Sequence, residues 1–399
     1  MMETQLLLCI SQEEVQNPYK FKMTNINVYS FEEALYHCFY YFKQSIDDFS
    51  SSDFLSWVKN DLGQSFLASK IKQLCTIKNA GDRLVGFLSL VDYFDEEQIL
   101  NLREQISEWG KRLEWEHLKE QADYLIENGE PRKAALFYKQ ALDHENNKIL
   151  LNNLGVALMQ VRNFSEAAAC FERALAHSDD TQKGESDFDF QITLNLIESS
   201  IYGKDFQKAL KFLKKAEDQH PENPDVYYLF GEFNFEAENI RYCVDYFKKA
   251  ISIESDTHYF IRIADVYLKL RQFDNALKIL ESSPKKDKHI LLKQAQVCEK
   301  QNNIPASIKC IEKALFFEMN DVELWTKLAM YHRLNYDLKN AFAAISKALN
   351  ISSENESTKI ELARIRKAQG KIKEYQSVLH DIMITLKQDY RDSVELLNI

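Results

Sequence analysis

Residues 118–143 read LKEQADYLIENGEPRKAALFYKQALD, and residues 151–176 read LNNLGVALMQVRNFSEAAACFERALA. Each stretch places a small residue, an alanine, a large aromatic residue and another alanine at the same spacings. These residues are Ala122, Ala134, Tyr138 and Ala141 in the first stretch, and Gly155, Ala167, Phe171 and Ala174 in the second. Small residues let the backbones of two helices approach closely, and the large residue is expected to fill the gap between neighbouring units. A pattern of this kind that recurs at a fixed period predicts a repeat protein.

The pattern extends to the C-terminus and defines eight units. Their first small positions are Ala122, Gly155, Ile197, Gly231, Ala264, Ala295, Ala329 and Ala363, with Ile197 the one large exception. Seven of the second-helix positions are small, and the eighth unit departs from the pattern at Lys359 and Tyr375. A divergent last unit is typical of a terminal cap, because its outer face contacts water.

This pattern resembles the tetratricopeptide repeat (TPR), a helix–turn–helix unit of about 34 residues. The resemblance implies an all-α, right-handed α-α superhelix of about eight helical hairpins, with a concave and a convex side. We expect residues 111–385 to form this superhelix and residues 386–399 to form a C-terminal helical tail or cap. His220–Pro221 and Asn223–Pro224 mark a boundary between units, because proline ends one helix and begins another.

One interval between units is about 42 residues long instead of about 34 and contains the acidic stretch SDDTQKGESDFDF, residues 178–190. A longer loop or an extended helix end explains it, since surface loops tolerate insertions. An acidic contact loop is the functional alternative.

Residues 1–110 lack the repeat pattern and predict a mainly helical N-terminal region, here called the leader. Partial alternation in residues 19–29 predicts a short strand, to which residues 6–10 could pair, giving a short β-hairpin. Ser30 and Glu33 have the spacing of a capping box before one long helix, residues 30–49. Further helices are expected at 52–60, 64–77, 81–93 and 95–111.

An apolar stripe at helical spacing follows the first leader helix. It consists of Leu35, Phe39, Phe42, Ile46 and Phe49, with Tyr36 and Tyr40 on one flank. We interpret the stripe as core packed against later helices, with an exposed partner surface as the alternative. A helical leader before such repeats is similar to peptide-sensing bacterial regulators. Those need basic DNA-reading residues, and this leader is acidic.

Composition narrows the class of protein. Only 10 glycines and 6 prolines occur among 399 residues, which disfavours a turn-rich β fold. No apolar run approaches the length that spans a bilayer, and no signal peptide is predicted. The 7 cysteines are scattered without a CxxC pair, and the net charge is −11. These features favour a cytoplasmic protein with reduced thiols, no membrane insertion and no nucleic-acid partner.

Motifs that carry chemistry are missing from the sequence. It holds no GxxxxGK[ST] or GxGxxG loop, no HExxH helix and no GxSxG turn. His37 and Cys38 are adjacent, but adjacent helical residues point apart. Paired acidic residues near helix ends are best explained as helix caps. We therefore predict no enzyme activity, no cofactor, no metal and no catalytic residue.

The TPR resemblance also implies where a ligand binds, namely the inner positions of the first helix of each unit. Chaperone tails are gripped in some TPR proteins by a set of lysines, asparagines and an arginine. Here only Lys119 and Asn153 match, and Asp123 would repel a carboxylate, so a chaperone C-terminal tail is an unlikely partner. The predicted peptide- or protein-binding residues are Glu198, Tyr202, Tyr228, Glu232, Phe235, Glu236, Asp265, Arg333, Arg364 and Lys367.

Aromatic residues beside carboxylates in the middle units predict a partner with basic and apolar residues. The last two units offer basic residues instead, so a groove acidic in the middle and basic at the end is expected. The prediction is a non-enzymatic TPR scaffold or adaptor that binds a protein or peptide on its concave face. A peptide-sensing bacterial regulator with a helical N-terminal effector region and an enzyme with a cryptic site are the alternatives. Solvated side chains without a ligand are the simpler explanation of the same inner residues.

Overall fold

A computed structural model describes residues 17–46, 48–177, 187–353 and 355–383. The chain divides into two compact units, residues 1–199 and 200–399, and each is described by itself. The predicted boundaries after residues 110 and 385 remain predictions. Residues 6–10, most of the acidic insertion and the tail at 386–399 lie outside the described residues.

The leader is a small helical region with a two-stranded antiparallel sheet. Tyr19 of β1 pairs with Val28 of β2, so a short hairpin is present, but it lies within residues 19–28, where the sequence predicts a single strand. The elements are β1 (Tyr19–Lys20), β2 (Asn27–Val28), α1 (Phe31–Tyr40), α2 (Phe42–Ser45), the 3₁₀ helix η1 (Asp48–Ser50), α3 (Ser52–Asn60), α4 (Ser65–Leu74), α5 (Ala80–Leu88) and α6 (Glu96–Trp109). The four later helices lie where the sequence predicts them: α3 has the predicted bounds, and α4, α5 and α6 end before the predicted residues.

The single helix predicted over residues 30–49 is wrong. Tyr41 leaves the helical conformation at φ −117° and ψ 39°, which separates α1 from α2. Ser30 caps α1 by accepting a hydrogen bond from the Glu33 amide, as predicted. Four of the five stripe residues are buried and Phe39 packs against the same core. Tyr36 and Tyr40 are 51% and 56% exposed, so they lie outside that core.

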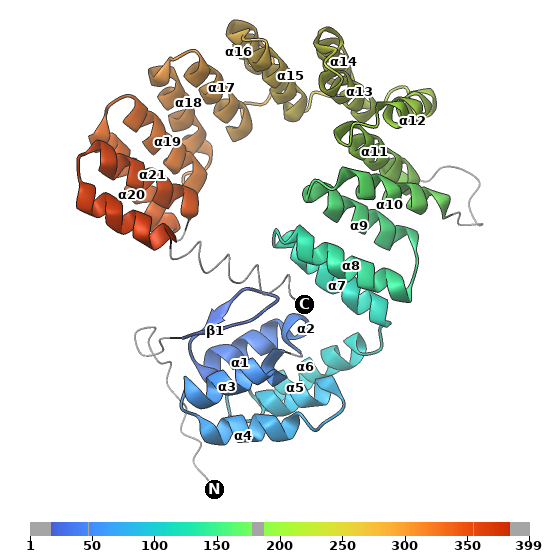
Figure 1. Ribbon diagram of the computed structural model, residues 1–399, viewed down its shortest axis with the longest axis vertical. Helices are drawn as coiled ribbons and strands as arrows, with labels where there is room; N and C mark the ends of the chain where they lie inside the picture. The colour runs from blue at the N-terminus through green and yellow to red at the C-terminus, as the bar shows by residue number, and fades with distance from the viewer. Residues whose placement is uncertain (1–16, 47, 178–186, 354, 384–399) are drawn as a thin grey trace. The chain divides into compact units, whose positions relative to one another are not determined.

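Consecutive helical hairpins follow the leader (Figure 1). Their helices are α7 (Glu114–Glu127), α8 (Pro131–His144), α9 (Lys148–Gln160), α10 (Phe164–Ala176), α11 (Asp187–Tyr202), α12 (Phe206–Gln219), α13 (Pro224–Glu236), α14 (Ile240–Ile253), α15 (Thr257–Lys269), α16 (Phe273–Ser282), α17 (Lys288–Lys300), α18 (Ile304–Phe317), α19 (Val322–Leu334), α20 (Leu338–Ile351) and α21 (Glu356–Ala368). Residues 372–383 form the second helix of the eighth hairpin. The predicted all-α repeat fold of about eight hairpins is confirmed.

The turn inside every hairpin has the same conformation. One residue, always seven positions after the first small residue, has φ between 57° and 75°; these residues are Gly129, Arg162, Lys204, Glu238, Arg271, Asn302, Tyr336 and Gly370. In each turn, the amide of the following residue donates to a carbonyl five residues earlier, as Asp337 does to His332 at 2.9 Å. This is the Schellman arrangement, which satisfies carbonyls at the helix end. The eighth unit, which departs from the sequence pattern, has the same turn.

Close packing explains the small and large residues of the pattern. A methyl group added at Gly155 would lie 2.5 Å from Cε1 of Phe171, and one at Gly231 would overlap the ring of Phe247. Both phenylalanine rings are fully buried. In the fifth and sixth units the first position is alanine, Ala264 or Ala295, and the large residue is aliphatic, Leu280 or Ile311, whereas the first unit combines Ala122 with Tyr138. In the second and fourth units, the absence of a side chain at the glycine therefore makes room for the phenylalanine ring.

Candidate functional site

The first helices of the hairpins carry most of the predicted ligand-binding residues. Within residues 200–399 these helices are α13, α15, α17, α19 and α21, and their common surface is called the inner face here. Asn223 caps α13 and Pro224 occupies its first turn, so the predicted proline boundary fixes where this series begins. Later first helices begin at capping aspartates, among them Asp256, Asp287 and Asp321.

Glu232 is the centre of an internal polar cluster. Its carboxylate has no solvent exposure, and it accepts hydrogen bonds from Nε and Nη2 of Arg262 at 2.5 and 2.8 Å. The Tyr202 hydroxyl donates a third at 3.0 Å. Burial alone would lower the pKa of Arg262, but its hydrogen bonds and charge attraction to Glu232 raise it. Glu232 is therefore neutralised within the chain.

Other acidic residues predicted in the middle units also have internal partners. The Lys293 ammonium donates to Asp265 at 2.8 Å, and Lys204 forms an ion pair with Glu236. Because these carboxylates are already paired, the middle of the inner face presents less negative charge than the sequence suggests.

The predicted aromatic residues of the middle units pack against neighbours in the next hairpin. The Phe235 ring lies under the Arg262 guanidinium and the Lys269 ammonium, with 4.6 and 4.2 Å to the ring centroid. Tyr228 packs against Phe247 of its own hairpin, and the centroid of its ring lies 4.7 Å from that of His258 in the next hairpin. Phe235 and Tyr228 thus join adjacent units as well as lining the inner face.

Arg333 and Arg364 meet at one carboxylate that the sequence analysis did not select. Glu361 is 3% exposed and accepts from Arg333 Nε at 2.6 Å and from Arg364 Nη1 at 3.3 Å. The Arg364 side chain remains 60% exposed. Lys367 is exposed and lies over the Tyr375 ring. The basic end predicted for the groove therefore keeps surface charge at Arg364 and Lys367.

The first two hairpins use their inner residues in the same internal way. Lys119 donates to Asp123 at 2.6 Å, and Asp123 also accepts from the Tyr138 hydroxyl at 2.5 Å. Asn153 lies at 3.4 Å from the same carboxylate. Lys119 and Asn153 thus converge on an acidic side chain. Glu198, in α11, is half-buried and takes part in further contacts.

The inner face contains a cavity of about 360 Å³ between three consecutive first helices. Its apolar floor includes Ile261 of α15, Leu292 of α17 and Met330 of α19. Its polar residues are His289, Lys293, Gln296, Glu299, Glu323, Lys327 and Tyr331. Sequence reasoning missed this cavity, although Gln296 and Met330 occupy the same repeat position as the predicted Glu232 and Asp265.

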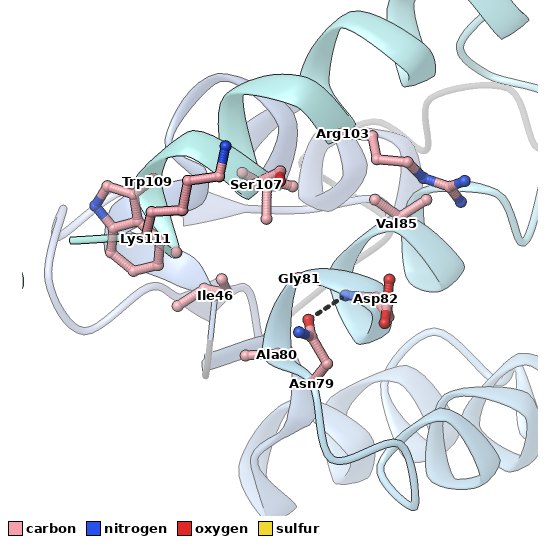
Figure 2. Close-up of a pocket in the computed structure, with 12 residues that line it drawn as sticks. Ile46, Asn79, Ala80, Gly81, Asp82, Val85, Arg103, Ser107, Trp109 and Lys111 are labelled. Carbon is pink, nitrogen blue, oxygen red and sulfur yellow. Dashed lines mark hydrogen bonds between the residues drawn. The ribbon is translucent and has the colours of Figure 1, made fainter. Parts of the chain in front are cut away.

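A second cavity, of about 460 Å³, lies in the leader (Figure 2). It is formed by the N-terminal turn of α5, with Asn79 to Asp82, and by the side of α6 that carries Arg103 and Ser107. Ile46 and Trp109 contribute apolar walls. Its lining combines the charges of Arg103 and Lys111 with that of Asp82, and the sequence analysis named none of these residues.

Within the described ranges, no group of three His, Cys, Asp or Glu side chains is placed to hold a metal ion. In the same residues, no helix has the length and apolar composition that crossing a bilayer requires.

The hairpins with identical turns define a helical-repeat protein. Residues 149–181 match the sequence profile described as the tetratricopeptide repeat. The eight units share one packing pattern and one turn, so the chain has the fold of TPR proteins, and its second unit matches the TPR profile.

Comparison with solved structures gives the same fold. The chain is similar to yeast Tom70, with 15% sequence identity, a TM-score of 0.50, and coverage of 92% of this chain and 88% of that one. It also matches a tetratricopeptide repeat protein from Parabacteroides merdae, at 20% identity, a TM-score of 0.40, and coverage of 63% and 98%. Pseudomonas aeruginosa PilF matches at 13% identity, a TM-score of 0.39, and coverage of 52% and 95%. No curated protein sequence matches the chain.

Proposed function

We propose that this protein is a non-enzymatic scaffold or adaptor that binds an extended, acidic peptide segment of a partner on its inner face. The cavity between α15, α17 and α19 is the observation that carries the proposal. TPR folds present protein-binding surfaces, and an apolar floor with polar walls suits a peptide with apolar anchors. Tyr228, Phe235, Asp265, Arg333, Arg364 and Lys367 flank or extend this surface and stay in the proposed site.

The charge of the surrounding helices supports an acidic partner. Helices α15, α17, α19 and α21 carry five acidic residues, Asp265, Glu299, Glu323, Glu356 and Glu361. They carry eleven basic residues, Arg262, Lys269, Lys288, Lys293, Lys300, Lys327, Arg333, Lys359, Arg364, Arg366 and Lys367. The sequence predicts a basic partner from four carboxylates, Glu198, Glu232, Glu236 and Asp265, and the last three form ion pairs within the chain. We therefore propose the opposite charge for the ligand.

Lys269 and Lys300 are the cations best placed to meet such a ligand. They occupy the same repeat position at the ends of α15 and α17, and both are exposed. Lys269 contacts the Phe235 ring, and neither lysine has a carboxylate partner among the described residues. An acidic segment that crosses both helix ends could pair with them without breaking an existing ion pair.

Fluorescence anisotropy with two labelled peptides tests this proposal. The probes are twelve-residue sequences that alternate leucine with glutamate or leucine with lysine. We expect saturable binding of the glutamate peptide and a loss of at least about tenfold in Lys269→Glu/Lys300→Glu, because two attractive pairs become repulsive. Lys248→Glu on α14, an exposed lysine of a second helix, is the control and should bind normally. Preference for the lysine peptide would contradict the proposal. Equal binding of the glutamate peptide by Lys269→Glu/Lys300→Glu and by Lys248→Glu would also contradict it.

A further inference from the structure

Five aromatic side chains form a continuous patch on the leader. They are called the aromatic patch here and are Tyr36, Phe39 and Tyr40 of α1, with Tyr93 and Phe94 of the loop between α5 and α6. The Tyr36 and Tyr40 rings lie one helical turn apart, with 4.4 Å between their centroids. Tyr40 contacts Phe39, whose ring stacks on that of Phe94 with 4.2 Å between centroids. Phe94 in turn contacts Tyr93, so ring contacts join α1 to this loop without a break.

The patch has a half-buried base and an exposed surface. Phe39 and Phe94 are half-buried and pack against the leader core, which fixes the positions of the other rings. Tyr36, Tyr40 and Tyr93 are exposed, the first two by more than half of their area. Among the residues that the structure describes, the hydroxyls of Tyr36 and Tyr40 have no hydrogen-bond partner. Large apolar side chains that are exposed together mark an interaction surface, and tyrosine is enriched at such surfaces.

The residues next to the patch along the chain are acidic. Asp92 directly precedes Tyr93, and Glu96 and Glu97 form the first turn of α6. These three side chains are exposed and have no ion-pair partner within the described ranges. The Lys43 ammonium of α2 is already paired with a carboxylate of α7. The charge available beside the aromatic patch is therefore negative, which favours a basic ligand.

We propose that the aromatic patch binds a proline-rich segment of a partner protein that also carries arginine or lysine. Proline-rich segments adopt the extended polyproline II conformation, in which the backbone carbonyls make no internal hydrogen bonds. Such segments dock on exposed aromatic side chains and lose little conformational entropy in doing so. The hydroxyls of Tyr36 and Tyr40 can donate to those carbonyls while their rings pack on the prolines. Asp92, Glu96 and Glu97 attract the basic residues.

The arrangement of the rings favours this ligand over two other basic ones. The rings of the aromatic patch contact one another, so they do not surround an empty space of the kind that binds a methylated ammonium group. An amphipathic helix hydrogen-bonds its own carbonyls, so its backbone offers the tyrosine hydroxyls few acceptors. The 6 prolines of this chain include no adjacent pair, so the segment is expected from another protein and not from a second copy.

The inference does not rest on the proposed peptide site of the inner face. The aromatic patch lies within the compact unit of residues 1–199, whereas the inner-face site lies within residues 200–399. The two expected ligands also carry opposite charges. Each proposal can therefore fail without the other.

Fluorescence anisotropy with the full chain and three labelled twelve-residue peptides tests the ligand class. The probes repeat Arg-Pro-Pro, Glu-Pro-Pro or Arg-Ala-Ala. We expect saturable binding of the Arg-Pro-Pro peptide and at least about tenfold weaker binding of the other two, because one lacks the positive charge and the other lacks the prolines. Binding of Arg-Ala-Ala as tight as that of Arg-Pro-Pro would show that charge alone attracts the peptide and would overturn the proposal. Preference for Glu-Pro-Pro would also overturn it.

Two double variants test the location. Tyr36→Ala/Tyr40→Ala removes the exposed rings of α1 and should weaken binding of the Arg-Pro-Pro peptide by at least about tenfold. Tyr242→Ala/Tyr336→Ala removes two exposed tyrosines of the repeat hairpins and should bind this peptide as the wild type does. Equal binding by the two double variants would contradict the assignment to the patch. The three peptides on the wild type still decide the ligand class if a variant fails to fold.

The oligomeric state distinguishes a second copy of the chain from a peptide ligand. Analytical ultracentrifugation of the wild type and of Tyr36→Ala/Tyr40→Ala should give the same mass. A wild-type dimer that this variant converts to a monomer, with no binding of Arg-Pro-Pro, would assign the aromatic patch to a contact between copies and would overturn the proposal.

Discussion

Arg262 holds the fully buried carboxylate of Glu232 from the next hairpin, thirty residues further along the chain, through two parallel N–H donors. Removing one member of a buried ion pair leaves an uncompensated charge, which typically costs about 3–5 kcal/mol. We therefore expect Arg262→Ala to lower the free energy of unfolding by that order, measured by urea denaturation followed by circular dichroism.

Arg241→Ala provides the matched control for that experiment. Arg241 is exposed in the first turn of α14 and has no ion-pair partner among the described residues. Its removal should change stability by less than about 0.5 kcal/mol. Equal stability of Arg262→Ala and the wild type would show that the Glu232 pair does not support the junction between hairpins. Replacing both Glu232 and Arg262 by glutamine and methionine should cost less than Arg262→Ala alone, since no buried charge remains.

Gly231→Ala should destabilise the fourth hairpin because the added methyl group overlaps the Phe247 ring. Overpacking of this kind costs about 1–3 kcal/mol. Phe247→Leu in the same chain should restore part of the loss, because it reproduces the alanine and leucine of the next unit, Ala264 and Leu280. Thermal denaturation of the single and double variants measures the coupling. A double variant whose losses simply add would contradict the explanation that the added methyl group and the Phe247 ring compete for the same space.

Tyr336→Gly should raise stability. Tyr336 has φ 61° in the turn between α19 and α20, and its side chain is 92% exposed, so the substitution relieves the backbone without losing packing. We expect a gain of about 0.5–1 kcal/mol, measured as a higher unfolding midpoint in urea.

Two neighbouring substitutions make this test specific to the backbone. Asn335→Gly changes the adjacent residue, whose φ is −85°, and should destabilise. Gly370→Ala, at φ 74° with no atom near the added methyl group, should destabilise through the backbone alone. A stabilising Asn335→Gly would point to some other effect of glycine.

The repeat fold could be predicted because its determinants recur. The spacing from Gly155 to Phe171 reappears from Gly231 to Phe247, and it reports a local contact between helices of one hairpin. The break at Tyr41 could not be predicted, because α1 and α2 both continue the same apolar spacing through it. Such a break depends on the leader's tertiary packing, which no local pattern records.

The candidate site could be predicted less well than the fold, because it depends on contacts between hairpins. Glu232 and Asp265 stand at inner positions, but their availability depends on cations one hairpin away, Arg262 and Lys293. The roughly thirty-residue separation between partners follows the repeat period and could have identified them. The cavity depends on relative side-chain lengths over three helices, and a single-sequence pattern does not give that information.

His37 should make the leader less stable at mildly acidic pH. Its ring is 3% exposed, stacks on Phe21 with 3.7 Å between centroids, and its Nδ1 has no hydrogen-bond partner. Burial lowers the pKa of His37 to about 4, below the unfolded value of about 6.5. Between these two pKa values the unfolded chain binds more protons at His37 than the folded chain does. The free energy of unfolding therefore decreases as the pH falls from about 6.5 towards 4. Between pH 7 and 5 the loss from this group is about 2 kcal/mol.

His37→Gln should remove that part of the pH dependence, because glutamine does not titrate and can still hydrogen-bond Thr24, which lies 2.7 Å from Nε2 of His37. The comparison uses urea denaturation of the full chain at pH 7 and pH 5, followed by hydrogen exchange of the α1 amides, which reports the leader. His258→Gln, an exposed histidine of α15, is the control and should keep the wild-type pH dependence in the leader. If the leader of His37→Gln loses as much stability between pH 7 and pH 5 as the wild-type leader does, other groups cause the acid sensitivity.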